Sequence, residues 1–183
     1  MRTHARRTAR ATFSLAATVS RRIAVPAALA AIAALLGPTT AVSQEDDRAE
    51  IMEVIDRLFD GMRENDGEKV GSVFLEGASL IRTEAPDGSP EPRYMAAATF
   101  AQAVDDADRP FDEPYWDPIV HIHDHLATVW IKYAFYLGET FSHCGVDAFI
   151  LARTDDGWRI AALADTSERD NCELPPDRQP FDG

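Results

Sequence analysis

The sequence predicts an α+β domain in which helices come first and a long antiparallel meander follows. Apolar residues recur at helical spacing from Gln44 to Met62, whereas β-branched and aromatic residues dominate from Tyr115 onward. The strongest signal is the last hairpin. Two β-like runs, 141–153 and 158–166, flank the turn Thr154-Asp155-Asp156-Gly157, and an Asp-Gly turn between such runs is typical of a β-hairpin.

Three helices are expected in the first half of the domain. The first, 44–62, has acidic residues in its first turn, where they favour the positive end of the helix dipole. A short second helix is expected at 68–74 and a third at 94–104. Between them, 78–83 is a strand candidate, and the proline- and glycine-rich segment 86–92 is expected to be a loop.

Strands are expected for the rest of the domain. The segment 119–123 alternates apolar and polar residues, and 126–137 is long and rich in β-branched and aromatic residues. Asp124-His125 and Gly138-Glu139-Thr140 are the turns on either side of the second strand. The polar, proline-containing tail 170–183 is expected to be irregular.

This order of elements resembles the nuclear-transport-factor-2-like (NTF2-like) superfamily, which includes SnoaL-like and ketosteroid-isomerase-like proteins. The return strand starting Gly157-Trp158-Arg159-Ile160 is typical of its last hairpin. The run 141–147 with Asp165-Thr166 looks like an exported bacterial subgroup of uncharacterised members. The resemblance covers 44–169. It implies a cone-shaped, curved antiparallel sheet wrapped around the N-terminal helices, with an internal pocket, and it implies that the domain can form a homodimer.

The first 43 residues read as a signal peptide. They hold six arginines and no acidic residue, followed by an apolar run from Ile23 to Leu36 and the small residues Ala41-Val42-Ser43. The apolar run is shorter than the roughly 20 residues that a membrane-spanning helix needs. Export to the periplasm or medium is therefore expected, an N-terminal anchor being the alternative. Arg21-Arg22 leaves the choice between the Sec and twin-arginine routes open.

The charge of the remaining chain excludes one class of partner. The whole sequence has 18 basic and 31 acidic residues. Loss of the six N-terminal arginines leaves 12 basic residues, and a formal charge of −19. Such a surface repels a phosphate backbone, so nucleic-acid binding is not expected. We expect no cofactor and no stable membrane insertion after signal removal.

The two cysteines, Cys144 and Cys172, both lie in the exported part. An oxidising compartment and an even count favour a disulfide between them, two free thiols being the alternative. Two isolated cysteines without a CxxC or Cys/His spacing do not indicate a metal site.

The turns determine which side chains share a face, because side chains alternate along a strand. We expect a two-residue turn at Asp124-His125 and the pairing of Phe135 with His143. Pairing Thr154 with Trp158 at the last turn then sets two carboxylates directly opposite each other. The resulting face contains Val120, Ile122, Val129, Ile131, Tyr133, Phe135, His143, Gly145, Asp147, Phe149, Leu151, Ala161, Leu163 and Asp165.

This predicted pocket face is mostly apolar, with Tyr133, His143, Asp147 and Asp165 as its polar members. An apolar wall with a few convergent polar groups is typical of a small-molecule site. Two facing carboxylates cannot both ionise cheaply there, so one pKa should rise and these residues become candidate acids and bases. The alternative is a structural role for the two aspartates, capping turns or pairing with Arg153, Arg159 or Arg169.

The opposite face of the sheet is expected to be a dimer interface or to be covered by the tail. Its expected members are Cys144, Trp130, Ala148, Ile150, Trp158, Ile160 and Ala162. Exposed tryptophan and isoleucine side chains suit an interface. A Cys144–Cys172 disulfide would instead hold the tail against this face.

His121 and His123 point to one side of the predicted strand, as two zinc ligands do. No third ligand is evident beside them, so exposed histidines near a hairpin tip are the expectation, and no metal is predicted.

Three functions are compatible with these patterns. The first is binding of a small, mostly apolar molecule in the sheet cavity. The second is an isomerase, hydratase or cyclase that uses the pocket Asp, His and Tyr side chains as acid and base. The resemblance to ketosteroid isomerases implies a carboxylate base and a tyrosine-plus-acid oxyanion hole, but the first helix here has no tyrosine. The third is a non-catalytic dimerisation domain.

Overall fold

A computed structural model describes residues 44–84, 89–170 and 172–175, all within one compact unit, Ala41–Gly183. The predicted signal segment, 1–43, lies outside the described residues. Helices α1 (Gln44–Glu64), α2 (Gly67–Ser72) and α3 (Ala97–Asp105) accompany seven strands. The strands are β1 (Phe74–Glu84), β2 (Glu91–Ala96), β3 (Phe111–Asp112), β4 (Tyr115–His123), β5 (Leu126–Leu137), β6 (Thr140–Thr154) and β7 (Gly157–Thr166).

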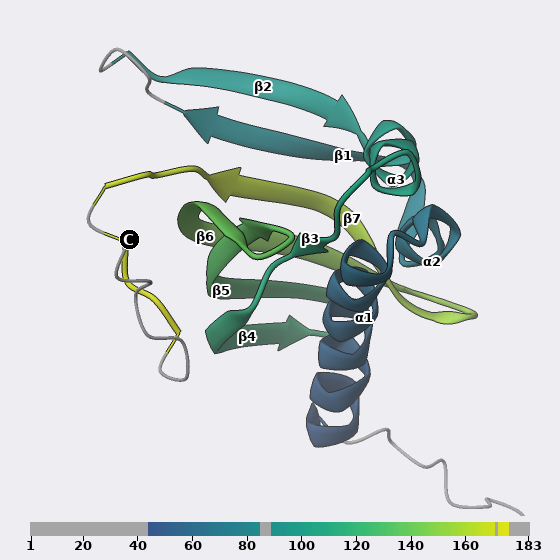
Figure 1. The fold of residues 1–183 in the computed structure, drawn as a ribbon. Helices are drawn as coiled ribbons and strands as arrows, with labels where there is room; N and C mark the ends of the chain where they lie inside the picture. The colour runs from purple at the N-terminus through teal and green to yellow at the C-terminus, as the bar shows by residue number, and fades with distance from the viewer. Residues whose placement is uncertain (1–43, 85–88, 171, 176–183) are drawn as a thin grey trace, which may run out of the picture. The chain divides into compact units, whose positions relative to one another are not determined.

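The seven strands form one curled sheet with α1 lying against its concave face (Figure 1). The strand order is β2-β1-β7-β6-β5-β3, and β4 also pairs with β5. All neighbours are antiparallel except β1 and β7, which are parallel. The predicted α+β architecture of a curved sheet around N-terminal helices is therefore confirmed, with one parallel pair added.

The core lies between α1 and the concave face of the sheet. Helical spacing places Ile51, Ile55 and Leu58 on one side of α1, and each is fully buried. Val129, Ile131, Phe149 and Leu151 face them from β5 and β6, which alternate buried and less buried residues. Each such side chain contributes about 1.5 to 3 kcal/mol by leaving water, so this contact holds the helix in the curl of the sheet.

Two predicted helices have different bounds in the structure. Phe74, expected at the end of the second helix, is the first residue of β1 and pairs with Ile160 of β7. The third helix, expected from Tyr94, begins at Ala97. Tyr94 instead pairs with Ile81 of β1 as part of β2. Ladder hydrogen bonds to a neighbouring strand override the local helical pattern at both places.

The register of the first two hairpins agrees with the prediction. Val120 pairs with Val129 and Phe135 pairs with His143. At the last turn the prediction is wrong, because Thr154 pairs with Gly157 rather than with Trp158.

A β-bulge in β7 offsets that difference. Leu151 pairs with Ile160 but Ile150 pairs with Ala162, so Ala161 is the extra residue. The register beyond the bulge is the predicted one, and Asp147 pairs with Asp165. Between the turn and the bulge, the side chains of β7 lie on the face opposite to the predicted one. Trp158 and Ile160, assigned to the outer face, are 1% and 0% exposed and belong to the core.

Candidate functional site

Three carboxyl groups come together where β6, β7 and the segment before β4 meet. Asp147 and Asp165 are direct cross-strand neighbours, and Glu113 forms a side-chain hydrogen bond with Asp147. Their exposed fractions are 2%, 8% and 7% for Asp147, Asp165 and Glu113. Buried carboxyl groups need partners or protons, because desolvation disfavours their charged form.

Arg82 supplies a close positive charge to this cluster. The parallel pairing of β1 with β7 sets Arg82 beside Asp165, and its Nε donates to Asp165 Oδ2 at 2.7 Å. The alternative structural reading of Asp165, an ion pair, is thus present, but with an arginine that the sequence prediction did not name. Arg153 pairs instead with Asp47 and Glu50 of α1.

Burial raises the pKa of all three carboxyl groups. The pKa of Glu113 rises to about 8, with desolvation as the main cause. Desolvation and the neighbouring carboxylates hold the pKa of Asp147 well above its usual range. Burial also raises the pKa of Asp165, and Arg82 opposes that rise. The Glu113–Asp147 hydrogen bond raises the pKa of Asp147 and lowers that of Glu113, so the pair holds a proton at neutral pH.

Tyr133 and His143, the other two predicted site residues, flank this cluster along the concave face. The Tyr133 hydroxyl donates to the carbonyl oxygen of Thr166 at 2.6 Å, and burial raises the pKa of the phenol above its usual range. The ring of His143 lies 4.9 Å from that of Phe135 and 5.7 Å from that of Tyr133, centroid to centroid. Burial lowers the pKa of His143 to about 4, so the imidazole is neutral at neutral pH.

Two buried polar atoms of this set have no hydrogen-bond partner within the described chain. They are His143 Nε2 and Asp147 Oδ2, on side chains that are 6% and 2% exposed. The other imidazole nitrogen, Nδ1, lies 3.0 Å from Ser142 Oγ. Most buried polar atoms in folded proteins are paired, so unpaired ones indicate where a ligand or an ordered water can bind.

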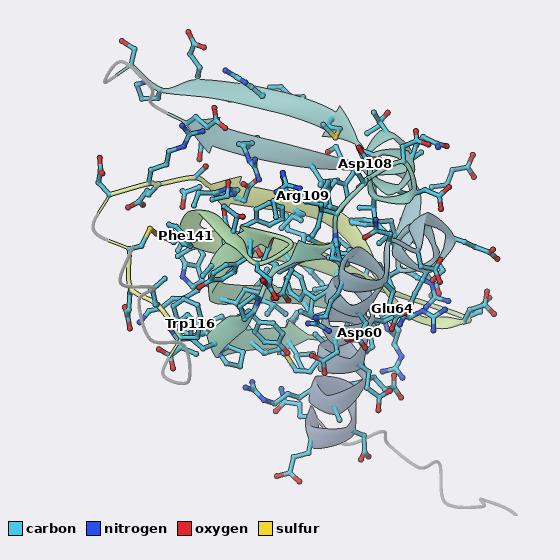
Figure 2. The ribbon with its side chains drawn as sticks, viewed as in Figure 1. Asp60, Glu64, Asp108, Arg109, Trp116 and Phe141 are labelled. Carbon is cyan, nitrogen blue, oxygen red and sulfur yellow. A yellow bond between two sulfur atoms is a disulfide. The ribbon has the colours of Figure 1, made fainter. Side chains whose placement is uncertain are left out.

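A cleft of about 270 Å³ opens between α1 and the start of β4, and Glu113 forms part of its wall. Figure 2 labels two other residues of its lining, Asp60 on α1 and Trp116 in β4. Phe59, Tyr115 and Trp116 make the lining aromatic. Its polar edge has Asp56, which accepts from the Tyr115 hydroxyl at 2.6 Å, and Arg63, which pairs with Asp60 at 2.8 Å.

The structure thus brings together Asp147, Asp165 and Tyr133, with His143 further along β6. Sequence reasoning missed Glu113 and Arg82. Glu113 stands next to Pro114 in the two-residue connection between β3 and β4, which was not predicted to be part of a strand, and Arg82 lies in a strand whose partner was not predicted. No pattern in the sequence distinguishes either residue from surface charge.

The histidines of β4 lie away from this site. His121 and His123 are exposed, and they pair with Thr128 and Leu126 of β5. Within residues 44–84, 89–170 and 172–175, no group of three or more potential ligands is placed to hold a metal ion. No helix among the described residues is long and apolar enough to cross a membrane.

Cys144 and Cys172 form a disulfide. It joins β6 to the segment that follows β7, as predicted from the cysteine count. Residues 172–175 of the predicted irregular tail have neither helix nor strand.

Comparisons with known proteins agree with this architecture. Residues 46–164 match the model of the family described as "Putative lumazine-binding". No curated protein matches the sequence. An NTF2-like protein of unknown function from Shewanella baltica is similar in structure, with a TM-score of 0.57 and 14% identity over 69% of this chain and 98% of that one.

Two further solved structures show the same fold. An NTF2-like protein with a cystatin-like fold from Novosphingobium aromaticivorans has a TM-score of 0.56 and 17% identity over 70% of this chain and 85% of that one. A "putative dehydratase" of the NTF2-like family from Streptomyces avermitilis has a TM-score of 0.53 and 14% identity over 68% of this chain and 98% of that one. Identities this low establish the fold and leave function to the site itself.

Proposed function

The chain belongs to the lumazine-binding-like family of NTF2-like domains, and from that premise we propose that it binds a small molecule in the cleft beside Glu113. This proposal rests on the position of Glu113, which belongs both to the buried carboxyl cluster and to the wall of the cleft. Its carboxyl group is hydrogen-bonded to the buried Asp147, and the same residue lines the open cleft. A molecule in the cleft therefore meets the polar cluster of the concave face through one side chain.

The lining of the cleft favours a flat ring with a polar edge. Phe59, Tyr115 and Trp116 offer aromatic surface, and ring pairs contribute about 0.5 to 1.5 kcal/mol beyond area burial. Trp116 Nε1 is a buried donor without a partner in the described chain, and Glu113 places a carboxyl group in the same wall. A flat ring with a carbonyl or imine acceptor for the indole N–H and a polar edge beside the carboxyl group fits both, which makes the predicted small, mostly apolar ligand more specific.

Lumazine is a suitable first probe, because it is a flat two-ring heterocycle with carbonyl and N–H groups. Titration of the protein into lumazine, followed by fluorescence, should show saturable binding. Glu113→Leu should weaken it by at least about tenfold, since an unpaired ligand group costs roughly 1 to 3 kcal/mol. Glu76→Gln, which neutralises an exposed carboxylate of β1 outside the cleft, should bind like the parent. Equal affinities for the parent and Glu113→Leu would overturn the placement of the site.

Acid–base catalysis is the second candidate, favoured by the proton that Glu113 and Asp147 hold at neutral pH. A dehydratase needs such a proton donor together with a base, and Asp165 beside Arg82 is the more readily ionised carboxyl group. Asp147→Asn and Asp165→Asn test this role. Turnover of any identified ligand that survives both substitutions rules out acid–base catalysis by Asp147 and Asp165.

A homodimer through the convex face of the sheet is the third part of the proposal. Ile119, Trp130 and Ile150 are 54%, 48% and 45% exposed and line a shallow apolar groove there. Contiguous exposed apolar surface is typical of interfaces. Sedimentation analysis should give a dimer for the parent chain and a monomer for Trp130→Glu; a monomeric parent removes this part of the proposal.

Export is supported by the disulfide, because such bonds persist in oxidising compartments. We place the signal at 1–43, the domain at 44–169 and the tail at 170–183. N-terminal sequencing of the protein recovered from the periplasm or medium should begin near Gln44; recovery of an uncleaved chain in the membrane fraction indicates the N-terminal anchor instead.

A further inference from the structure

The segment Cys172–Pro175, here called the strap, runs from the disulfide to the proposed ligand cleft. It starts at the Cys144–Cys172 disulfide on β6. Glu173 then pairs with Lys132 of β5, with Nζ–Oε distances of 3.1 and 3.2 Å. Pro175 is buried and forms part of the cleft wall with Pro114 and Trp116 at the start of β4. The strap thus crosses two strands and ends in the site.

The attachments of the strap differ in strength. A disulfide is covalent, whereas Lys132 and Glu173 are exposed and contribute little as an ion pair in water. Upstream of the strap, the backbone of Glu168 exchanges two hydrogen bonds with Cys144, of 2.8 and 2.9 Å. Those bonds hold the chain as far as Glu168, so the disulfide is the strong attachment nearest to Pro175.

We propose that Pro175, held by the Cys144–Cys172 disulfide, is a specificity-determining wall of the cleft, and that reduction of the disulfide opens the cleft. This inference rests on the proposed ligand site. Proline suits such a wall, because its ring is rigid and apolar and its fixed φ lowers the entropy of the strap. A wall held in advance favours tight binding, since the ligand does not have to order it.

The wall can be tested without any ligand. Tryptophan can be replaced throughout the full chain by 5-fluorotryptophan, which gives one ¹⁹F resonance each for Trp116, Trp130 and Trp158. Trp116→Phe assigns the resonance of the cleft. The solvent-isotope shift of each resonance between H₂O and D₂O then measures its exposure to water.

Reduction with dithiothreitol and the double variant Cys144→Ser, Cys172→Ser should both increase the isotope shift of Trp116. Pro175→Gly should increase it in the oxidised protein. The resonances of Trp158, which is 1% exposed, and Trp130, which is outside the cleft, should stay unchanged. Glu173→Gln is the matched control, since it weakens only the exposed ion pair and should leave the Trp116 shift unchanged.

Lumazine binding separates this inference from the proposed function. Loss of the wall should weaken lumazine binding by about tenfold or more. An unchanged Trp116 shift after verified reduction overturns the strap as a wall, whatever lumazine does. A larger Trp116 shift with unchanged lumazine affinity overturns its role in specificity. If the oxidised parent does not bind lumazine, the proposed ligand fails, and the Trp116 shift alone decides whether the strap closes the cleft. Circular dichroism of every variant confirms that the sheet is folded.

Discussion

At the residue scale, the proton that Glu113 and Asp147 hold together ties the stability of the fold to pH. The pKa of Glu113 is about 8 in the folded chain, against an ordinary value of 4.5 for a glutamate in water. Between those values the folded protein binds one more proton than the unfolded chain. The stabilisation that this proton gives the fold is complete below about pH 4.5 and is lost as the pH rises through 8. A salt-bridged carboxylate usually behaves in the opposite way, because its stabilisation is lost as the pH falls.

We therefore expect this proton to lower the free energy of unfolding by up to about 1.4 kcal/mol per pH unit between pH 6.5 and pH 8; below pH 6.5 the lowered pKa of His143 has the opposite effect and offsets it. Glu113→Gln keeps a neutral group of the same shape and should flatten that slope. Urea denaturation at several pH values measures it, with the exposed Glu76→Gln as control. A slope that is the same in Glu113→Gln and in the parent would show that Glu113 is ionised in the folded protein.

Arg82 gives a second prediction at this scale. It is the ion-pair partner of Asp165, so Arg82→Met should destabilise the fold more at pH 8 than at pH 5, because the raised pKa of Asp165 makes a lost positive partner matter more as this buried carboxyl group ionises. Arg93→Met, which loses only an exposed pair with Glu84 on the neighbouring strand, should have a small effect at both values. Chemical denaturation of both variants at the two pH values makes the comparison, and equal losses for Arg82→Met at pH 5 and 8 contradict it.

The sequence places part of this cluster and not the rest, for a physical reason. Asp147 and Asp165 follow from strand alternation, because their strands are long and joined by a recognisable turn. Arg82 reaches Asp165 only through a parallel pairing between strands far apart in sequence. Glu113 reaches Asp147 from the two-residue connection between β3 and β4, two strands that lie on the far side of β5 from β6. Such tertiary contacts leave no periodic pattern, so both residues looked like ordinary surface charge.

At the scale of elements, the last hairpin shows how two differences can cancel. The turn is one residue tighter than predicted, and the bulge at Ala161 restores the register before Asp165.

The strand β2 was not predicted, for another reason. It is an exposed edge strand carrying Glu91, Pro92 and Arg93, residues that disfavour strands in general but protect an edge from further pairing.

The close approach of β6 to Thr166 predicts that Gly145 cannot be replaced. A Cβ at Gly145 would overlap the backbone carbonyl oxygen of Thr166, and that oxygen also accepts from Tyr133. Gly145→Ala should destabilise the fold by about 1 to 3 kcal/mol, the range of overpacked sites.

Gly71→Ala is the matched control for that experiment. Its Cβ would lie 3.8 Å from the Cβ of Ala101, and alanine favours a helix, so the change should be neutral or slightly stabilising. Urea denaturation compares the two variants. An equally small effect at both glycines would mean that β6 and Thr166 can move apart without a loss of stability.

At the scale of the whole molecule, the disulfide closes a loop between residues 28 positions apart. In the chain-entropy picture a loop of this size is worth about 3 to 4 kcal/mol. The double variant Cys144→Ser, Cys172→Ser should be less stable by that amount, and dithiothreitol should lower the stability of the parent but not of the variant. Equal stability of parent and variant under oxidising conditions contradicts the expectation.

The same bond determines where a mechanical load enters the fold. A pull on the chain beyond Cys172 passes through the sulfur atoms to Cys144, well inside the pairing of β6 with β5. β7 carries none of that tension, although it lies nearer to the end of the chain. In the reduced protein the tension first reaches the two backbone hydrogen bonds between Glu168 and Cys144 and then the end of β7 at Thr166, so that the strand can be peeled from its neighbours one pair at a time. Under load, the reduced protein thus loses its C-terminal strand β7 first, whereas the oxidised protein must break the pairing of the central strand β6.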